Sequence, residues 1–168
     1  RLDADAAALL KQGSAELGCV RVASLDTAGR VIWTYSGVDD AATPGAASVM
    51  DPERRAALQR ALAGGGQPAV TMDARVTGTS GPEAGFVIYA PVYRAGRPTG
   101  AVAAEFSARK FFHVITTARA RIDDHYHVTV AANGVTLFQN APSDATRLPA
   151  LAAERTQVVA GHRLKVGI

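Results

Sequence analysis

The stretch "GFVIYAPVYRAGRPTGAVAAEF", residues 85–106, predicts the centre of the fold. It contains two apolar runs joined by a segment with glycine, proline and arginine, and it is almost free of charge on its strand-like parts until Glu105. Apolar runs bounded by turn-forming residues are typical of a β-hairpin. Such a hairpin can be plain core, one wall of a ligand pocket, or the floor of an active site.

The residues around this hairpin extend the pattern in both directions. The runs "CVRVASLD" and "RVIWTYSG" flank "TAG", and "PAVTMDARVTG" precedes the hairpin, so these segments add three strands. In the strand over 68–78 we expect two alternating sets of side chains on opposite faces. One set is Val70, Met72, Ala74 and Val76, and the other is Thr71, Asp73 and Arg75.

Three segments carry helical periodicity. They are residues 1–17, 51–63 and 107–122. In the second helix, Asp51 and Pro52 fit the N-cap and the first helical position. Its buried stripe is expected to consist of Ala57, Leu58, Ala61 and Leu62. That stripe places Arg54 and Arg55 on the solvated face.

The order of elements predicts an α+β fold. Five strands with one helical excursion form an antiparallel sheet with helices on one side. The tail, residues 123–168, contains two further hairpins, one around Asn133–Gly134 and one around Ala160–Gly161. We therefore expect a smaller, strand-rich second lobe.

Composition excludes several classes of protein. With 168 residues the chain fits one domain, or one domain with an appendage, and 48% hydrophobic residues exclude a disordered tail. The net charge of +3 is small and the basic residues are scattered, so nucleic-acid binding is not expected. The single cysteine, Cys19, provides neither an internal disulfide nor a cysteine metal site, and we expect a small buried hydrophobe there.

The ends of the chain indicate a piece of a longer protein. It begins at Arg1 rather than Met, and it ends within the strand-like "HRLKVGI". No run approaches the roughly 18 apolar residues of a membrane span, and no signal peptide is present. We expect flanking segments, membrane spans among them, outside the printed sequence.

Several short segments of the sequence resemble motifs of a sensor family. They are "ALQRALAG" from Ala57, "VT" at Val70–Thr71, "GFVIYAPVY" from Gly85, and "GAVAAEF" from Gly100. Together with the order of elements, they are similar to a CHASE domain, a PAS-like extracytoplasmic sensor, over about residues 48–115. The resemblance implies a five-stranded PAS-like sheet, a membrane-anchored receptor as parent, and a histidine kinase or cyclic-nucleotide signalling enzyme as output.

The resemblance also implies a division of the chain. A stalk helix occupies residues 1–18, and a membrane-distal sensor lobe occupies 19–107. A connecting helix over 108–122 leads to a membrane-proximal lobe over 123–168. The stalk helix is marginal in water by itself, so it must pack on something, and we expect it to form a homodimer.

Two ligand signatures of related domains are missing. Cytokinin-binding relatives place an aspartate just before the methionine that precedes the pocket helix, where this chain has Ala47, Ser48 and Val49 ahead of Met50. Amino-acid-binding relatives use an Arg-plus-aromatic signature on the pocket helix, and "PERRAALQRAL" lacks the Trp and Tyr. Neither ligand class is supported by the sequence.

A pocket over the central strands needs an apolar lining and a few oriented polar groups. The candidate lining residues are Trp33, Tyr35, Met50, Met72, Phe86, Ile88 and Ala90, and the candidate polar groups are Arg75, Tyr89 and Glu105. Each aliphatic residue has an ordinary core position as its alternative, and alternation favours a solvent-facing Arg75. Small side chains at Ala101, Ala103 and Ala104 leave room for a cavity.

Catalytic and metal sites are not predicted. His125 and His127 share a strand face near Asp124, but zinc would need a further ligand such as His162, so a solvated strand entrance is the favoured interpretation. No nucleophile lies in a catalytic motif and no glycine-rich phosphate loop is present. We expect no cofactor, no metal and no enzymatic activity in this domain.

Two functional hypotheses remain. The first is a periplasmic sensor domain of an inner-membrane protein, which binds a small molecule and relays a conformational change across the membrane. The second is a structural or dimerisation module of a membrane receptor with a filled sheet and no ligand.

Overall fold

A computed structural model describes residues 16–36, 51–78, 81–120, 127–140, 153–159 and 162–167. The elements of the first part of the chain are β1 (Cys19–Asp26), β2 (Val31–Ser36), α2 (Pro52–Ala63), β3 (Ala69–Gly78), β4 (Gly81–Arg94) and β5 (Arg97–Ser107). Those of the second part are α3 (Ala108–Val114), the π-helix η1 (Ile115–Ala120), β6 (Thr129–Ala132), β7 (Val135–Gln139), β8 (Glu154–Val159) and β9 (His162–Gly167).

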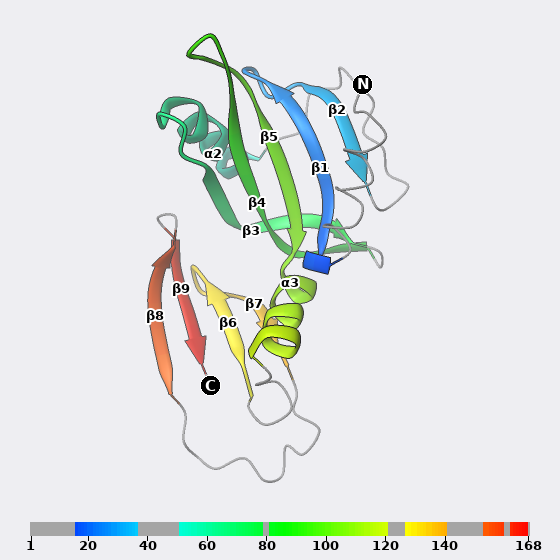
Figure 1. The fold of residues 1–168 in the computed structure, drawn as a ribbon. Helices are drawn as coiled ribbons and strands as arrows, with labels where there is room; N and C mark the ends of the chain where they lie inside the picture. Colours follow the sequence, from blue (N-terminus) through cyan, green and yellow to red (C-terminus); the bar gives the residue numbers. More distant parts are fainter. Residues whose placement is uncertain are drawn as a thin grey trace.

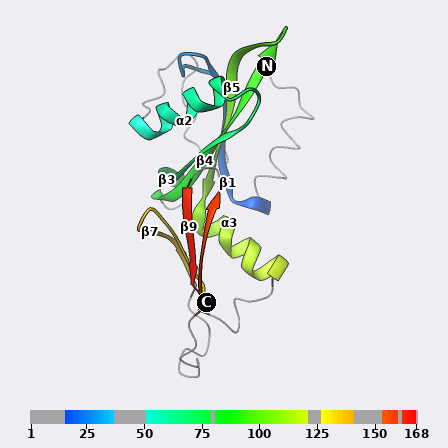
Figure 2. The same cartoon turned by 90° about the vertical axis from the view of Figure 1, so that its left-hand side faces the viewer.

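The first five strands form one antiparallel sheet in the order β2-β1-β5-β4-β3. The hairpin of β4 and β5 lies at its centre, as the opening stretch of sequence predicts, and α2 packs on β3, β4 and β5. Figure 2 shows α2 along one side of this sheet. The α+β class is confirmed, and the helix predicted over residues 1–17 lies almost entirely outside the described residues.

The last four strands form a second antiparallel sheet in the order β7-β6-β9-β8. Figure 1 shows it below the first sheet, with α3 leading from the end of β5 towards it. The turn between β6 and β7 has positive φ at Asn133 (51°) and Gly134 (83°), which this residue pair tolerates and which suits a two-residue hairpin. The predicted hairpin at this position is confirmed.

Glycine is required at the start of the central stretch. A Cβ atom at Gly85 would collide with the carbonyl oxygen of Phe106 on the neighbouring strand and with both methyl groups of Val76. Gly85 therefore lets β3, β4 and β5 approach closely at this end of the sheet.

Two sequence predictions of regular structure are wrong in detail. The pairing of β3 with β4 shifts between Thr71 and Ala74, so strict alternation does not hold along β3. Val70 and Met72 pack with one cluster, whereas Val76 belongs to the core beneath α2. The irregularity moves the later residues of the strand to the other face.

The predicted helix over 107–122 is also not continuous α-helix. It changes to π-helix at Ile115, where the hydroxyl of Thr116 donates to the carbonyl of Phe112 at 2.9 Å. The hydroxyl of Thr117 donates to the carbonyl of His113 at 2.6 Å. Hydroxyls that bond backwards to helical carbonyls compete with the regular ladder, and π-helical turns arise where that ladder is disturbed.

Candidate functional site

A buried cluster of charged side chains lies between α2 and the first sheet. One carboxylate oxygen of Glu105 on β5 accepts hydrogen bonds from Nη1 of Arg54 and from Nη2 of Arg21, both at 3.0 Å. Its second oxygen also accepts from Nη2 of Arg21, at 3.1 Å. Glu105 and Arg54 are both buried, so their charges are held close together largely out of water.

Helical spacing explains the position of Arg54. It lies three, four and seven residues before Ala57, Leu58 and Ala61, which are all buried. Arg54 therefore shares their stripe and points at the sheet, so the expectation of a solvated Arg54 is wrong. Arg55 is exposed, as predicted. The four-residue stripe is the sequence signal that identifies Arg54.

Further hydrogen bonds fix the Arg54 side chain and the start of its helix. Nη2 donates to the carbonyl oxygen of Arg75 on β3 at 2.6 Å. The carboxylate of Asp51 caps α2 by accepting from the backbone N–H of Arg54 at 2.8 Å, and it lies 3.6 Å from Nε of the same residue. Arg54 thus contacts the buried carboxylate of Glu105 and the half-exposed carboxylate of Asp51, whereas Arg21 contacts that of Glu105.

Strand register brings polar residues of three strands into one row, with an apolar residue of β4 between two of them. Arg21 pairs with Glu105, Glu105 pairs with Val87, and Val87 pairs with Thr71. Directly opposed residues project from the same face of a sheet. The row therefore crosses β1, β5, β4 and β3 on the side that α2 covers.

Tyr89 lies on the same face, two residues along β4 from Val87. Its side chain is only 2% exposed and packs in the core beneath α2. Burial raises the pKa of the Tyr89 phenol to about 12, with the positive charge of Arg54 acting in the opposite direction and Glu105 in the same direction as burial. Tyr89 therefore shares with Glu105 the face of the sheet that α2 covers.

Thr71 adds an unpartnered polar group to this face. Its side chain is 2% exposed, and among the described residues its hydroxyl has no hydrogen-bond partner. A buried hydroxyl without a partner destabilises a fold by about 1–3 kcal/mol, so Thr71 is a candidate to bind a ligand. Sequence periodicity did not identify Thr71, since alternation alone assigns no role to a strand threonine.

The sequence-predicted site residues do not converge on one pocket. Tyr89 and Glu105 lie on the α2 side, in the cluster described above. Register places the others of the central strands on the opposite face, where Tyr35 pairs with Val22 and Trp33 with Ser24. The residues of that opposite group are Trp33, Tyr35, Met72, Phe86, Ile88 and Ala90.

Three of the predicted pocket residues are either exposed or outside the described residues. Ala90 is exposed. Arg75 is exposed as predicted, although the irregularity in β3 places its side chain on the side of Met72 rather than opposite it, and its carbonyl contributes to the cluster. Met50 lies outside the described residues. The small residues divide in the same way, with Ala101 and Ala103 buried beneath α2 and Ala104 on the opposite face.

The opposite face carries an aromatic cluster that joins the two sheets. Phe86 stacks on Phe106 with ring centroids 5.0 Å apart, and Phe111 of α3 meets Phe86 edge-on at 4.9 Å. Phe111 contacts Phe112 at 5.4 Å, and Phe112 contacts Phe138 of β7 at 6.0 Å. The rings form a continuous apolar connection from β4 and β5 through α3 to the second sheet.

The histidines considered as metal ligands contact groups other than a metal-binding cluster. Nε2 of His127 lies 2.8 Å from the amide nitrogen of Gln139, and Nε2 of His162 lies 2.7 Å from the carbonyl oxygen of Val70 on β3. His125 lies outside the described residues. Across the described ranges, no group of three or more histidine, cysteine or acidic side chains is arranged to hold a metal ion. Within those same ranges, no helix is long and apolar enough to cross a membrane.

Comparison with solved structures defines the class of fold. A domain of a Vibrio parahaemolyticus sensory box/GGDEF family protein superposes with a TM-score of 0.62 at 10% identity, over 99% of this chain and 78% of that one. The ligand-binding domain of a Pseudomonas aeruginosa amino-acid chemoreceptor, in complex with GABA, gives 0.53 at 17% identity, over 99% and 80%. At these identities the likeness establishes a shared sensor-domain fold.

An extracellular ligand-binding receptor from Desulfohalobium retbaense has the same fold, with a TM-score of 0.54 and 16% identity. The match covers 99% of this chain and spans 33% of that receptor. No curated protein matches the sequence. The family model of the CHASE domain matches residues 45–147, so the chain belongs to the CHASE domain family.

Proposed function

We propose that this CHASE domain is an extracytoplasmic sensor that binds a small molecule on the α2 side of its five-stranded sheet. The observation that carries the proposal is a group of polar side chains there, of which Arg54, Thr71, Tyr89 and Glu105 are buried and Arg21 is partly exposed. Buried polar groups are costly unless they are satisfied, and the hydroxyl of Thr71 has no partner among the described residues. The fold shared with ligand-binding domains of receptors supports the same proposal.

The free donors of the cluster favour a ligand with acceptor oxygens. Both oxygens of Glu105 already accept from arginine, so an ammonium group would have to displace an existing ion pair. Among the described residues, Arg21 bonds Glu105 through Nη2 alone, which leaves further guanidinium N–H groups, and the hydroxyls of Thr71 and Tyr89 can donate as well. A small carboxylate or carbonyl compound fits this set best.

The same strand offers a route for the signal. Glu105 faces α2, and the next residue, Phe106, faces the aromatic cluster that reaches α3 and the second sheet. A ligand that repositions Glu105 would shift β5 and so change the packing of Phe106 against Phe111. Binding moves such an equilibrium only by its differential affinity for the two arrangements.

The parent protein follows from the same proposal. A membrane-anchored receptor would carry this domain outside the cytoplasm and a signalling output inside, with the lobes divided at residues 107–108 and 122–123. The segment over residues 1–18 would serve as the stalk and pair with a second copy. Within this proposal the domain itself is a sensor without catalytic activity.

A thermal-shift screen with matched variants tests the proposal. We expect a small carboxylate or carbonyl compound to raise the melting temperature of the native protein in a concentration-dependent manner, since a ligand at 100 times its Kd stabilises by about 2.7 kcal/mol. Thr71→Val keeps the shape of the side chain and removes the hydroxyl. It should weaken binding about tenfold without lowering the stability of the free protein.

The matched control is Thr99→Val. Thr99 lies on β5, is exposed, and donates to the carbonyl of Val92 at the far end of the hairpin, so its loss should leave binding unchanged. If no compound shifts the melting temperature, or if both variants behave alike, the ion pairs of Glu105 are structural. The domain would then be a dimerisation or spacer module.

A further inference from the structure

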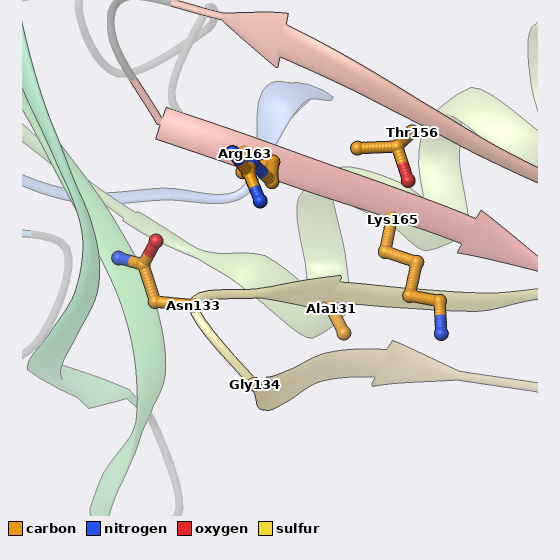
Figure 3. Close-up of a pocket in the computed structure, with 6 residues that line it drawn as sticks. All are labelled: Ala131, Asn133, Gly134, Thr156, Arg163 and Lys165. Atoms are coloured by element: carbon orange, nitrogen blue, oxygen red, sulfur yellow. The ribbon is translucent and has the colours of Figure 1, made fainter.

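The second sheet carries a basic groove that is separate from the cluster beneath α2. Its volume is about 420 Å³, and its walls are formed by Ala131, Asn133, Gly134, Thr156, Arg163 and Lys165. Figure 3 shows these side chains on β6, β8, β9 and the β6–β7 turn. A volume of this size is within the range of small-molecule sites, about 300–1,000 Å³.

Strand register explains how the groove forms. Lys165 on β9 pairs with Ala131 on one side and with Thr156 on the other, so small side chains flank the lysine. Val130 and Val166 pair with each other on the opposite face, where they pack in the core with Phe138. The groove therefore lies on the face of the second sheet that is turned away from this core.

The chemistry of the lining is that of an anion site. Arg163 and Lys165 are two residues apart on one strand face, a spacing of about 6.6 Å along the strand. Within the described part of the chain Arg163 forms no ion pair, whereas Lys165 is paired with Glu154 at 2.6 Å. The amide of Asn133 and the hydroxyl of Thr156 add neutral donors.

We propose that this groove binds a phosphate-bearing molecule. A phosphate offers several acceptor oxygens in a tetrahedral arrangement, which donors on two neighbouring strands can share, and arginine is well suited to bind it with two parallel hydrogen bonds. The volume exceeds that of a bare phosphate ion, so the ligand is an organic phosphate. It is either a soluble metabolite or the head group of an anionic lipid.

The test is an NMR titration of the uniformly labelled protein with glycerol 3-phosphate, with glycerol as the neutral control. We expect saturable amide shifts at Asn133, Gly134 and Thr156, which weaken as salt is added, because exposed charges are screened over about 8 Å at physiological ionic strength. Arg163→Gln should reduce the affinity about tenfold or more, since hydrogen bonds to charged groups are the strong ones.

Arg155→Gln is the matched control. Arg155 is an exposed arginine on the adjacent strand β8, but it pairs with Val166 and so projects from the other face of the sheet. Its substitution should leave the titration unchanged. Both arginines are exposed, so neither variant is expected to unfold the protein.

A flotation assay distinguishes the two sources of phosphate. Vesicles of phosphatidylcholine with about one third phosphatidylglycerol should bind the native protein and the Arg155 variant, but not the Arg163 variant, if the ligand is a lipid head group. Saturable binding of glycerol 3-phosphate without vesicle binding assigns a soluble ligand. The proposal is overturned if neither probe binds, or if Arg155→Gln weakens binding as much as Arg163→Gln does.

Discussion

The two faces of strand β5 differ in chemistry although they are built from alternating residues of one segment. On the α2 face, Glu105 is buried with two arginines in a polar cluster. On the other face, Phe106 stacks on Phe86 in an apolar aromatic cluster that continues to the second sheet. The polar face offers hydrogen-bonding groups beneath α2, whereas the aromatic face packs the first sheet against α3 and the second sheet.

The energetics of the two faces also differ. The aromatic face is stabilised by burial of apolar area. Because its side chains are closely packed, a substitution that leaves a cavity there is costly. The polar face depends on the pairing of charges that are costly to bury singly. The predictions below use this contrast, and the two on stability each have a control residue elsewhere in the protein.

Phe86→Ala should have the largest effect on stability. Phe86 is buried and contacts two other rings, so its truncation should lower the free energy of unfolding by about 3–5 kcal/mol. Urea denaturation measures this loss. Tyr93→Ala serves as the control, because Tyr93 is exposed at the end of the same strand and should change stability by less than about 1 kcal/mol. Equal losses would contradict the assignment of the aromatic cluster as core.

Glu105→Ala should have the next largest effect on stability. It leaves Arg54 without its buried carboxylate partner and with only the half-exposed carboxylate of Asp51 nearby, at a cost of about 3 kcal/mol. Replacing both partners, as in Arg54→Met with Glu105→Leu, should recover much of that loss, because the unpaired charge is removed as well. The comparison is again made by urea denaturation.

Glu83→Ala is the control for that experiment. Glu83 lies 3.8 Å from Arg109, whose side chain is largely exposed, so this pair should contribute no more than about 1 kcal/mol. A Glu105 variant as stable as the Glu83 variant would mean that the polar face is solvated, and the distinction between the two faces would fail.

Tyr89 gives the polar face a pH dependence. Its pKa in the folded protein is about 12, whereas an unfolded tyrosine titrates near 10. The unfolded state therefore releases this proton first, and stability should fall by about 1.4 kcal/mol per pH unit between pH 10 and 12 relative to Tyr89→Phe. Paired urea titrations of the native protein and the variant measure the difference. A difference that is constant over this range would contradict the buried position of the phenol.

Cys19 provides the smallest effect, which is seen in reactivity rather than stability. Burial raises the pKa of the Cys19 thiol to about 11, so at neutral pH its thiolate fraction is about 100-fold lower than that of a free cysteine with a pKa near 9. Iodoacetamide should alkylate the folded protein correspondingly slowly, and the urea-unfolded chain at the ordinary rate. Equal rates in the two states would show that this end of β1 is open.

Periodicity and turn chemistry predict most of the fold. The hairpins around residues 27–29, 95–96 and 133–134 and the start of α2 at Asp51 follow from local rules, because turn residues and caps act over a few positions. The irregularity in β3 and the π-helix after Val114 do not follow from these rules, since each arises from a local break in the periodic ladder.

The candidate site is predicted less well than the fold. Alternation assigns residues to two faces but does not say which face α2 covers. The pocket predicted from the sequence therefore combines Trp33 and Phe86 with Tyr89 and Glu105, which lie on opposite faces. Arg54 was missed because its charge suggested solvent, although its spacing from Leu58 indicates burial. Burial of a charge depends on a partner from another element, and one sequence does not show which element meets which.

Native mass spectrometry of the purified protein and of its Thr71→Val variant tests the central claim most directly. The account predicts that the native protein retains a small carboxylate or carbonyl compound, or takes one up on incubation with a metabolite extract. The Thr71→Val variant should remain folded and carry less of it. If the two proteins carry the same adducts, or if both are empty under every condition, the polar cluster beneath α2 is not a ligand site.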